Sequence, residues 1–552
     1  MPRPFPLRAC LGILLTCPTI AVSQDGIDFK AERSKYEGYL QRPSLRKRTD
    51  GRVYFAQTKD PRARDILIKS YGKPEEPQDH NKYLIATIVT DYFAHSTEDE
   101  VFDNWRRRFK KPIDAWLWFE TLRIEPMRKN REQLMEIVTG RDNTYVRAAA
   151  FQALIENSDS HSIDRDFVTW LSARLDELPS KEVDRALMLE PVGAMIAKKR
   201  SNVREEPWKE LCRKLIQITF DDDKTPQRSK IVIARYLAET FDCQNLGFRS
   251  LFWNSELDRD PRASRGSSGE TSSVGFAGIR TKGDHIVYVI DASDSMCKPV
   301  SGEVDRSGPT TGAKKAKVEK GVVPTANDLD WDRIHTRFDA AREFLRLSLN
   351  SLEDDSKFAV VLFGKDAEAL QATPTLVKST PQNIKKALSE LYSIEYGATR
   401  PDRPDGTLRG TTNLHGGIRL AYRMTNSGIT KKAEYADTKS MLEGCDTVFI
   451  LSDGAPSTDD WLMRDKAEDH DQAGDPESHH KQEKTEFLIF QGPYADGQYT
   501  FLVEDVERMN LLRRCEIHCV AIGEARDQLL ESISKIGHGQ SIRIDSRLKE
   551  RK

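Results

Sequence analysis

An apolar run near the middle of the chain ends in a cluster of acids and hydroxyls. The stretch VIDASDSM places Asp291, Ser293 and Ser295 at alternate positions where the run HIVYVI stops. A second apolar run, TVFILS, ends in Asp453, and Thr412 lies between the two runs in the stretch GTTN. All five side chains offer oxygen and none is a soft ligand, which is the chemistry that magnesium and calcium prefer. The residue types therefore predict a site for a hard divalent cation.

The elements that must position these residues alternate along the C-terminal half of the chain. Short apolar strands are predicted at 285–291, 357–364, 446–454, 516–523 and 540–544. Amphipathic helices are predicted at 333–352, 381–394, 413–424, 503–514 and 527–537. Strands that are apolar throughout, with helices between them, are typical of a parallel sheet covered on both faces. Ligands bind such sheets beyond the carboxyl ends of the strands, so Asp291 and Asp453 meet there if their strands are neighbours.

This pattern resembles a von Willebrand factor A (VWA) domain with a metal-ion-dependent adhesion site (MIDAS). The family motif D-x-S-x-S is met by Asp291, Ser293 and Ser295, the motif threonine by Thr412, and the distal aspartate by Asp453. The resemblance covers residues 281–546 and implies a Rossmann-like, doubly wound α/β fold. It implies that the serines and the threonine contact Mg²⁺, or Ca²⁺ or Mn²⁺, directly, and that the aspartates act through water and hydrogen bonds. It also implies that an Asp or Glu of a partner protein completes the site.

Alternatives remain at this site. Thr411 could serve in place of Thr412, and a domain of the same fold could have lost its metal. Polar insertions at 298–331 and 455–502 follow the two metal-side strands. Loops on a rigid scaffold often carry function, so these insertions are either a rim or lid over the site or solvated decoration.

The region before this domain is expected to be helical. Segments between 79 and 252 carry apolar residues at spacings of three and four and come in pairs, which is typical of an α-solenoid. RDNTYVRAAAFQAL at 141–154 resembles the second half of a HEAT repeat, and a plain helical bundle is the alternative. Residues 24–78 are interpreted as a poorly packed, charged N-terminal arm with short helices. Residues 253–280, rich in Ser, Gly and charge, are interpreted as a linker.

The N-terminus has the layout of a secretory signal peptide. Residues 1–23 contain two arginines, a short apolar run and small residues before a cleavage point near Ser23. The mature chain is therefore expected to be exported, to the periplasm, the cell surface or the medium, with no transmembrane segment. Outside the cytosol disulfides are permitted. Cys445 and Cys515 each lie eight residues before a strand end, so aligned parallel strands would bring them together as a disulfide.

Composition and motifs narrow the function. The chain has 552 residues, with 85 Lys and Arg against 87 Asp and Glu and a net charge of −2, which gives no general attraction to nucleic acid. No GxSxG, HExxH or Walker sequence is present, so no enzyme activity is expected. The leading hypothesis is an exported binding protein that takes a partner's carboxylate at the metal. The alternatives are a scaffold that binds through its helical repeats and, less favoured, a metallohydrolase. No sequence feature indicates an oligomeric state.

Overall fold

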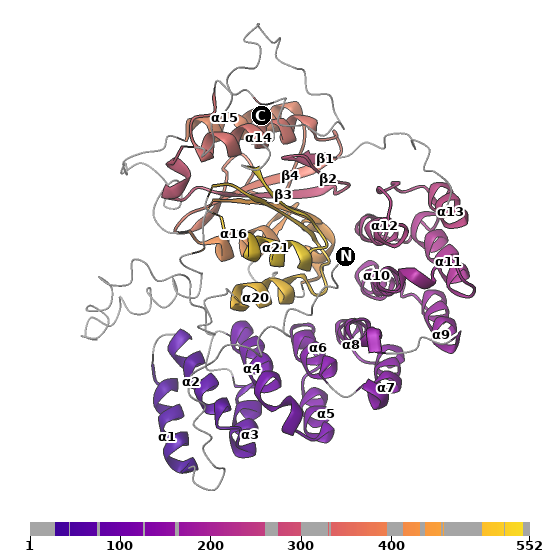
Figure 1. Cartoon of the computed structure of the whole chain (residues 1–552), viewed down its shortest axis with the longest axis vertical. Helices are drawn as coiled ribbons and strands as arrows, with labels where there is room; N and C mark the ends of the chain where they lie inside the picture. The colour runs from indigo at the N-terminus through magenta and orange to yellow at the C-terminus, as the bar shows by residue number, and fades with distance from the viewer. Residues whose placement is uncertain are drawn as a thin grey trace, which may run out of the picture.

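The chain folds into a helical region followed by an α/β domain, as the computed structural model in Figure 1 shows. The structure describes residues 28–42, 45–73, 78–124, 127–160, 165–259, 274–299, 329, 333–394, 412–430, 437–453, 456, 500–523 and 525–544. The predicted signal peptide lies outside these residues, as do most of both predicted insertions. Along the described part of the chain, no helix is both long enough and apolar enough to cross a bilayer.

The helical region is an arc of helices packed in pairs. Its members are α1 (Phe29–Leu40), α2 (Leu45–Gln57), α3 (Pro61–Ser70), α4 (Gln78–Phe93), α5 (Asp99–Arg108), α6 (Ala115–Arg123), α7 (Met127–Thr139), α8 (Thr144–Glu156), α9 (Arg165–Asp176), α10 (Glu182–Lys198), α11 (Trp208–Phe220), α12 (Gln227–Phe241) and α13 (Ser250–Asp258). Even-numbered helices from α2 to α12 line the inner side of the arc, and each of them packs on the next. The sequence prediction of a paired helical region is confirmed at this level.

Two predicted boundaries of this region are wrong. Residues 28–73 are not a poorly packed arm, because α1, α2 and α3 belong to the arc and share its core. Their apolar residues are few but large, and the rings of Tyr36 and Phe55 stack at 4.4 Å. At the other end, the predicted linker begins inside α13, where Trp253 and Leu257 are buried. Residues 260–273 of that linker lie outside the described residues.

The α/β domain is built on one mostly parallel sheet. Its strands are β3 (His285–Asp291), β4 (Lys357–Phe363), β5 (Ala367–Ala369), β6 (Val377–Lys378), β9 (Thr447–Ser452), β10 (Glu516–Ala521) and β11 (Ser541–Arg543). The order is β11-β10-β9-β3-β4-β5, with β6 also paired to β4. The five predicted strands are all present and all parallel, whereas β5 and β6 are antiparallel additions that the sequence analysis missed. The predicted α/β class is confirmed in this coarse form.

Helices cover both faces of the sheet because each central strand is apolar on both sides. Along β3, Val287 and Val289 face one core, while Ile286, Tyr288 and Ile290 face the other. The helices on the first face are α16 (Leu414–Arg423), α20 (Thr500–Asn510) and α21 (Asp527–Ile536). The helices on the second face are α14 (Arg337–Ser351) and α15 (Pro381–Ser393).

Small elements complete the domain. The hairpin of β1 (Val274–Phe276) and β2 (Ile279–Thr281) overlaps the end of the predicted linker and extends one residue beyond it, and its Phe276 and Ile279 are fully buried. Its turn, Ala277-Gly278, has positive φ at both residues, as a type I′ hairpin turn requires. The others are the pair β7 (Met424–Thr425) and β8 (Gly428–Ile429) and the helix α17 (Thr438–Glu443).

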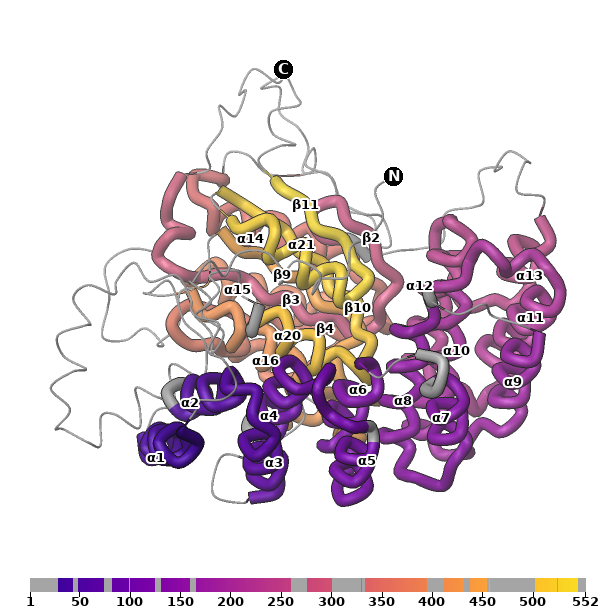
Figure 2. The backbone as a smooth tube through the Cα atoms, turned by 60° about the horizontal axis from the view of Figure 1, so that its bottom comes forward, coloured from indigo at the N-terminus to yellow at the C-terminus, as the bar shows by residue number. Residues whose placement is uncertain are grey.

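The inner side of the arc packs against the α/β domain (Figures 1 and 2). Arg228 of α12 donates from Nη1 to the carbonyl oxygen of Met441 in α17 at 2.7 Å and from Nη2 to that of Leu512, after α20, at 3.1 Å. Arg514 donates to Gln152 of α8 at 2.7 Å and to Tyr236 of α12 at 2.9 Å. One continuous apolar core joins the arc to the first face of the sheet. The two regions therefore form one packed unit.

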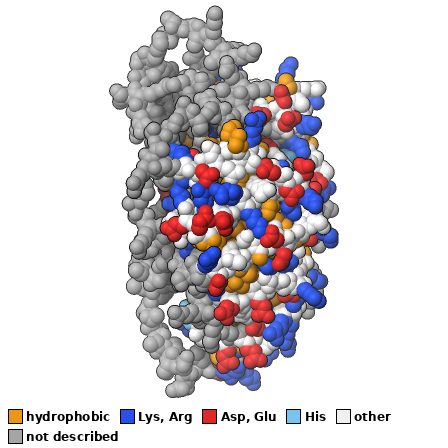
Figure 3. Space-filling model, turned by 90° about the vertical axis from the view of Figure 1, so that its right-hand side faces the viewer, with side chains coloured by type: hydrophobic (Ala, Val, Ile, Leu, Met, Phe, Trp, Pro, Cys, Tyr) orange, Lys and Arg blue, Asp and Glu red, His pale blue; other side chains and the backbone are white. Residues whose placement is uncertain are grey.

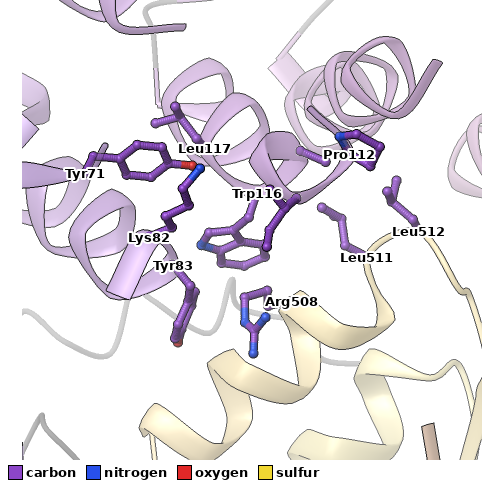
Figure 4. Close-up of a pocket in the computed structure, with 11 residues that line it drawn as sticks. Tyr71, Lys82, Tyr83, Pro112, Trp116, Leu117, Arg508, Leu511 and Leu512 are labelled. Carbon is purple, nitrogen blue, oxygen red and sulfur yellow. The ribbon is translucent and has the colours of Figure 1, made fainter. Parts of the chain in front are cut away.

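Farther along the same seam, α20 meets α4 and α6 around a small cavity (Figure 4). The guanidinium of Arg508 lies 4.5 Å from the centre of the Tyr83 ring, with Trp116 close by. Such cation–π stacking is favourable and orients both side chains.

The side of the molecule shown in Figure 3 is mainly polar. Its acidic and basic side chains are interspersed, with apolar side chains between them.

Candidate metal-binding site

The two strands that end in aspartate are neighbours at the centre of the sheet. β3 pairs with β9 in parallel, with Ile290 opposite Leu451. Asp291 is the last residue of β3 and Asp453 directly follows β9, so both acids lie at the carboxyl edge of the sheet. Both are buried. The condition on which the sequence prediction depended, that these strands are adjacent, is confirmed.

The loop after β3 turns back on itself and gathers the hydroxyls. The backbone N–H of Ser293 donates to Asp291 Oδ1 at 2.9 Å, and a 3₁₀ turn follows at Asp294–Cys297. The hydroxyl oxygens of Ser293 and Ser295 are 3.0 Å apart, and Ser295 Oγ donates to Asp453 Oδ1 at 2.7 Å. Met296 is fully buried and anchors the turn. Four of the five predicted residues thus form one hydrogen-bonded group.

Thr412, the fifth predicted residue, lies at the same edge of the sheet. It is buried and directly precedes Asn413, the N-cap of α16, whose side chain accepts from the Gly416 N–H at 2.8 Å. The Asn413 N–H donates to the carbonyl oxygen of Gly364, just beyond the end of β4, at 2.8 Å. Because β4 is next to β3, this bond holds Thr412 one strand away from Asp291. The alternative residue, Thr411, lies outside the described residues.

The structure adds two polar residues that sequence reasoning missed. Ser452 Oγ donates to Asp291 Oδ2 at 2.7 Å. Arg337 Nη1 donates to Asp453 Oδ2 at 2.7 Å, in a salt bridge that is almost completely buried. The sequence did carry a signal for Arg337. In TRFD, Thr336 and Asp339 form a capping box, which puts an arginine at the first position of a helix, where the dipole disfavours a positive charge.

The electrostatics of the group favour a bound cation. Burial, and then the neighbouring charge of Asp453, raise the pKa of Asp291 to about 7, despite hydrogen bonds from Ser293 and Ser452 that lower it. When both buried carboxylates are ionised, the single guanidinium of Arg337 leaves the group with one net negative charge. Carboxylate and hydroxyl oxygens are hard donors. The residues present therefore fit Mg²⁺, Ca²⁺ or Mn²⁺ better than a soft transition metal.

The donor set also explains another observation. Among the described residues, no group of three or more His, Cys, Asp and Glu side chains gathers as a metal site. The candidate site has only two carboxylates and takes its other donors from Ser and Thr.

Most of the two predicted insertions, at 298–331 and 455–502, lies outside the described residues, so their predicted role as rim or lid stays a prediction.

The cysteine pair lies at the opposite edge of the sheet. Cys445 and Cys515 precede β9 and β10 by one or two residues, and their sulfur atoms are 3.8 Å apart. Both are buried free thiols in this structure. The predicted proximity is confirmed, whereas the disulfide itself stays a prediction. The hydrogen bond from Cys515 lowers the pKa of Cys445, and burial raises the pKa of Cys515.

Comparison with known proteins adds no assignment to this geometry. No protein-family model matches the sequence, and no curated protein matches it significantly.

Proposed function

We propose that this chain is an exported binding protein that holds a divalent cation at Asp291, Ser293, Ser295, Thr412 and Asp453. The cation would take an Asp or Glu side chain of a partner protein as its remaining ligand, as in VWA domains with a MIDAS, which the sequence motif resembles. Mg²⁺ is the expected ion, with Ca²⁺ or Mn²⁺ as substitutes.

One observation carries the proposal. Two neighbouring parallel strands end in buried aspartates that share a hydrogen-bonded group with Ser293 and Ser295. Carboxylates at the carboxyl ends of central strands occupy the place where open α/β sheets bind ligands. The protein supplies only two carboxylates, and the other donors are neutral hydroxyls. A divalent cation held in this way can still accept one more anionic oxygen.

The packing of the arc argues against the alternative in which the helical repeats bind the partner. Solenoids usually bind on their concave face. Here helices of that face contact the α/β domain, through Arg228 and Arg235 of α12 and Gln152 of α8 among others. The other alternative is a metallohydrolase. None of the described contacts at this site favours hydrolysis over the binding of a partner's carboxylate.

The test is calorimetric titration of Mg²⁺ into the mature protein, with Asp453→Asn and Ser295→Ala beside it. We expect binding by the wild type and a loss of at least tenfold in each variant, because each change removes an oxygen donor of the group. Asparagine retains the shape of Asp453 and a hydrogen-bond acceptor for Arg337.

The matched control is Asp294→Asn, which removes an exposed carboxylate from the same loop. This variant should bind Mg²⁺ like the wild type. Equal binding by all four proteins, or no binding by the wild type, would refute the proposed site.

A further inference from the structure

Arg337 is held firmly beside the proposed metal site. Its backbone N–H donates to the carbonyl oxygen of Lys298, which ties the start of α14 to the loop that carries Ser293 and Ser295. Its side chain is 3% exposed, and Nη1 donates to Asp453 Oδ2 at 2.7 Å. The guanidinium therefore binds one oxygen of the Asp453 carboxylate, while Ser295 donates to the other, Oδ1.

The space for this guanidinium is provided by a glycine. Gly523 follows β10, the strand next to β9, and has a φ of +60°. A Cβ built on Gly523 would lie 2.2 Å from Cζ of Arg337. A larger residue at 523 would therefore collide with the guanidinium in its present place. The close approach of a backbone lacking Cβ is a second observation that this position accommodates the arginine.

The charges at the site depend on Arg337. With both carboxylates ionised, Asp291 and Asp453 carry two negative charges, and Arg337 reduces them to one. A divalent cation then leaves the loaded site with one net positive charge. Without Arg337 the loaded site would be neutral. An arginine side chain stays protonated in proteins, so this contribution is constant across the working range of pH.

We propose that Arg337 is a specificity-determining residue of the metal site, a tethered cation that weakens metal binding and strengthens the binding of an anionic ligand to the loaded site. This inference depends on the proposed function, because it requires a metal at Asp291 and Asp453. It goes beyond that function because Arg337 lies outside the family motif. Its role is to make the loaded site prefer a carboxylate to a neutral oxygen ligand.

The experiment compares Arg337→Gln with the wild type in two titrations. In the first, Mg²⁺ is titrated into each protein by calorimetry, and the variant should bind on the order of tenfold more tightly because a neighbouring positive charge is gone. In the second, acetate or neutral acetamide is added to each Mn²⁺-loaded protein, and water-proton relaxation reports ligand binding. The variant should lose on the order of tenfold in acetate affinity relative to acetamide.

Two further variants separate charge from shape. Arg337→Lys retains the charge and should bind metal and acetate within a few-fold of the wild type. Arg346→Gln makes the same change later in α14, where the arginine pairs with Glu343 at 2.8 Å, and should change neither titration. If Arg337→Gln fails to fold, Arg337→Met, which is long and uncharged, takes its place. Failure of both to fold would make Arg337 a structural residue and overturn the proposal.

The outcomes distinguish this inference from the proposed function. No Mg²⁺ binding by the wild type would refute the metal site itself. Binding by the wild type, with unchanged affinities for Mg²⁺ and acetate in Arg337→Gln, would leave the metal site standing and overturn the role of Arg337. Tighter Mg²⁺ binding with weaker acetate binding is the expected result.

Discussion

Buried carboxylates lie at both edges of the sheet, and their hydrogen-bond donors differ between the two edges. At the carboxyl edge, Asp453 accepts from Ser295 with one oxygen and from Arg337 with the other. At the amino edge, Asp446 Oδ2 accepts from the backbone N–H groups of Asp284 and His285 at 3.1 and 2.9 Å. Buried carboxylates are costly unless they are paired in this way. Asp453 has a cationic partner in Arg337, whereas these donors to Asp446 are neutral, so the ionised form of Asp446 stays costly.

Asp446 should make stability depend on pH. Burial, and then the charge of Asp284, raise the pKa of Asp446 from 3.8 to about 7. The folded state binds the Asp446 proton more tightly than the unfolded state does. The stability that this proton contributes is therefore fully present below pH about 4 and is lost as pH rises through about 7. Asp446→Asn, which cannot ionise, should gain stability relative to the wild type over this window, by up to about 4 kcal/mol.

Denaturant unfolding at pH 5, 6, 7 and 8 in metal-free buffer measures this effect. Asp294→Asn, at an exposed position, is the control and should follow the wild-type curve. Parallel curves for Asp446→Asn and the wild type would contradict the assignment.

Cys445 and Cys515 should form a disulfide in an oxidising compartment. Their sulfurs are 3.8 Å apart and need to approach by about 2 Å to bond. The lowered pKa of Cys445 favours the thiolate that attacks an oxidised partner. Protein isolated without reductant and then unfolded should show two fewer reactive thiols than reduced protein. Cys445→Ser should remove the difference, and labelling of both cysteines in the unreduced wild type would exclude the bond.

For individual residues, the sequence motif predicted the five candidate metal-site residues. It did not predict Ser452 and Arg337, which contact the site but lie outside the motif. Asp291, Ser293 and Ser295 are close because they are neighbours in one loop, whereas the adjacent ends of β3 and β9 bring Asp453 to them. Arg337 comes from a helix start about 40 residues later in the chain, beyond an insertion, and only the three-dimensional packing brings it to Asp453.

At the scale of elements, α16 connects the proposed metal site to the rest of the fold. Its N-terminus carries Thr412 and Asn413, and its body lies on β3 and β4. His415 Nε2 and Asp505 Oδ2 of α20 are 2.7 Å apart, and both side chains are fully buried. Any shift of α16 over the sheet therefore moves the edge that holds Thr412.

Gly417 sets how closely α16 approaches the sheet. A Cβ at this position would lie 2.9 Å from Val289 Cγ1 and 3.1 Å from Phe363 Cδ1. Gly417→Ala should destabilise the protein by about 1–3 kcal/mol through overpacking and should also weaken Mg²⁺ binding. Thermal unfolding and calorimetry measure the two effects.

Gly38→Ala in α1 is the matched control, since a Cβ at that position would have nothing within 4 Å of it. In that helix alanine should raise stability by up to about 1 kcal/mol. A gain of stability at Gly417 would show that α16 has room to move.

The long elements were predictable because apolar runs and helical spacing extend over many residues. β3 was predicted with its observed bounds, and the other central strands within two residues. β5 and β6 are only three and two residues long, too short for a period to show, and they pair antiparallel to β4. The β1–β2 hairpin was missed because each of its strands has only three residues, which is too short for an alternating pattern to show.

At the scale of the whole molecule, the arc and the α/β domain share one core, and arginine side chains form hydrogen bonds across the interface between them. Arg228 donates to carbonyl groups of the α/β domain and pairs with Glu190 of α10 at 3.2 Å. Glu190 is 1% exposed, so removing Arg228 leaves this buried charge with the more distant Arg514, at 3.9 Å, and the Ser229 hydroxyl. No feature of the sequence predicted this contact, because it joins residues about 210 to 280 positions apart.

Arg228→Met should therefore destabilise the protein by about 3–5 kcal/mol and uncouple the two regions. In scanning calorimetry, the wild type should unfold in one transition and the variant in two. Arg213→Met is the control, because Arg213 and its partner Asp258 are each about half exposed and such pairs contribute little. A single, unshifted transition in Arg228→Met would mean that apolar packing alone holds the seam.

The strand order also determines when each region can fold during synthesis. The arc is built from contacts between helices that are near in the chain, whereas β3 needs β9, and the bond from Ser452 to Asp291 closes a loop of 161 residues. Local contacts form early and distant strand pairing forms late. We therefore expect the arc to form while β3 still lacks β9 as a neighbour. Until β9 joins the sheet, apolar residues of the inner helices and of β3 face water, so we expect the partly folded chain to be prone to aggregation.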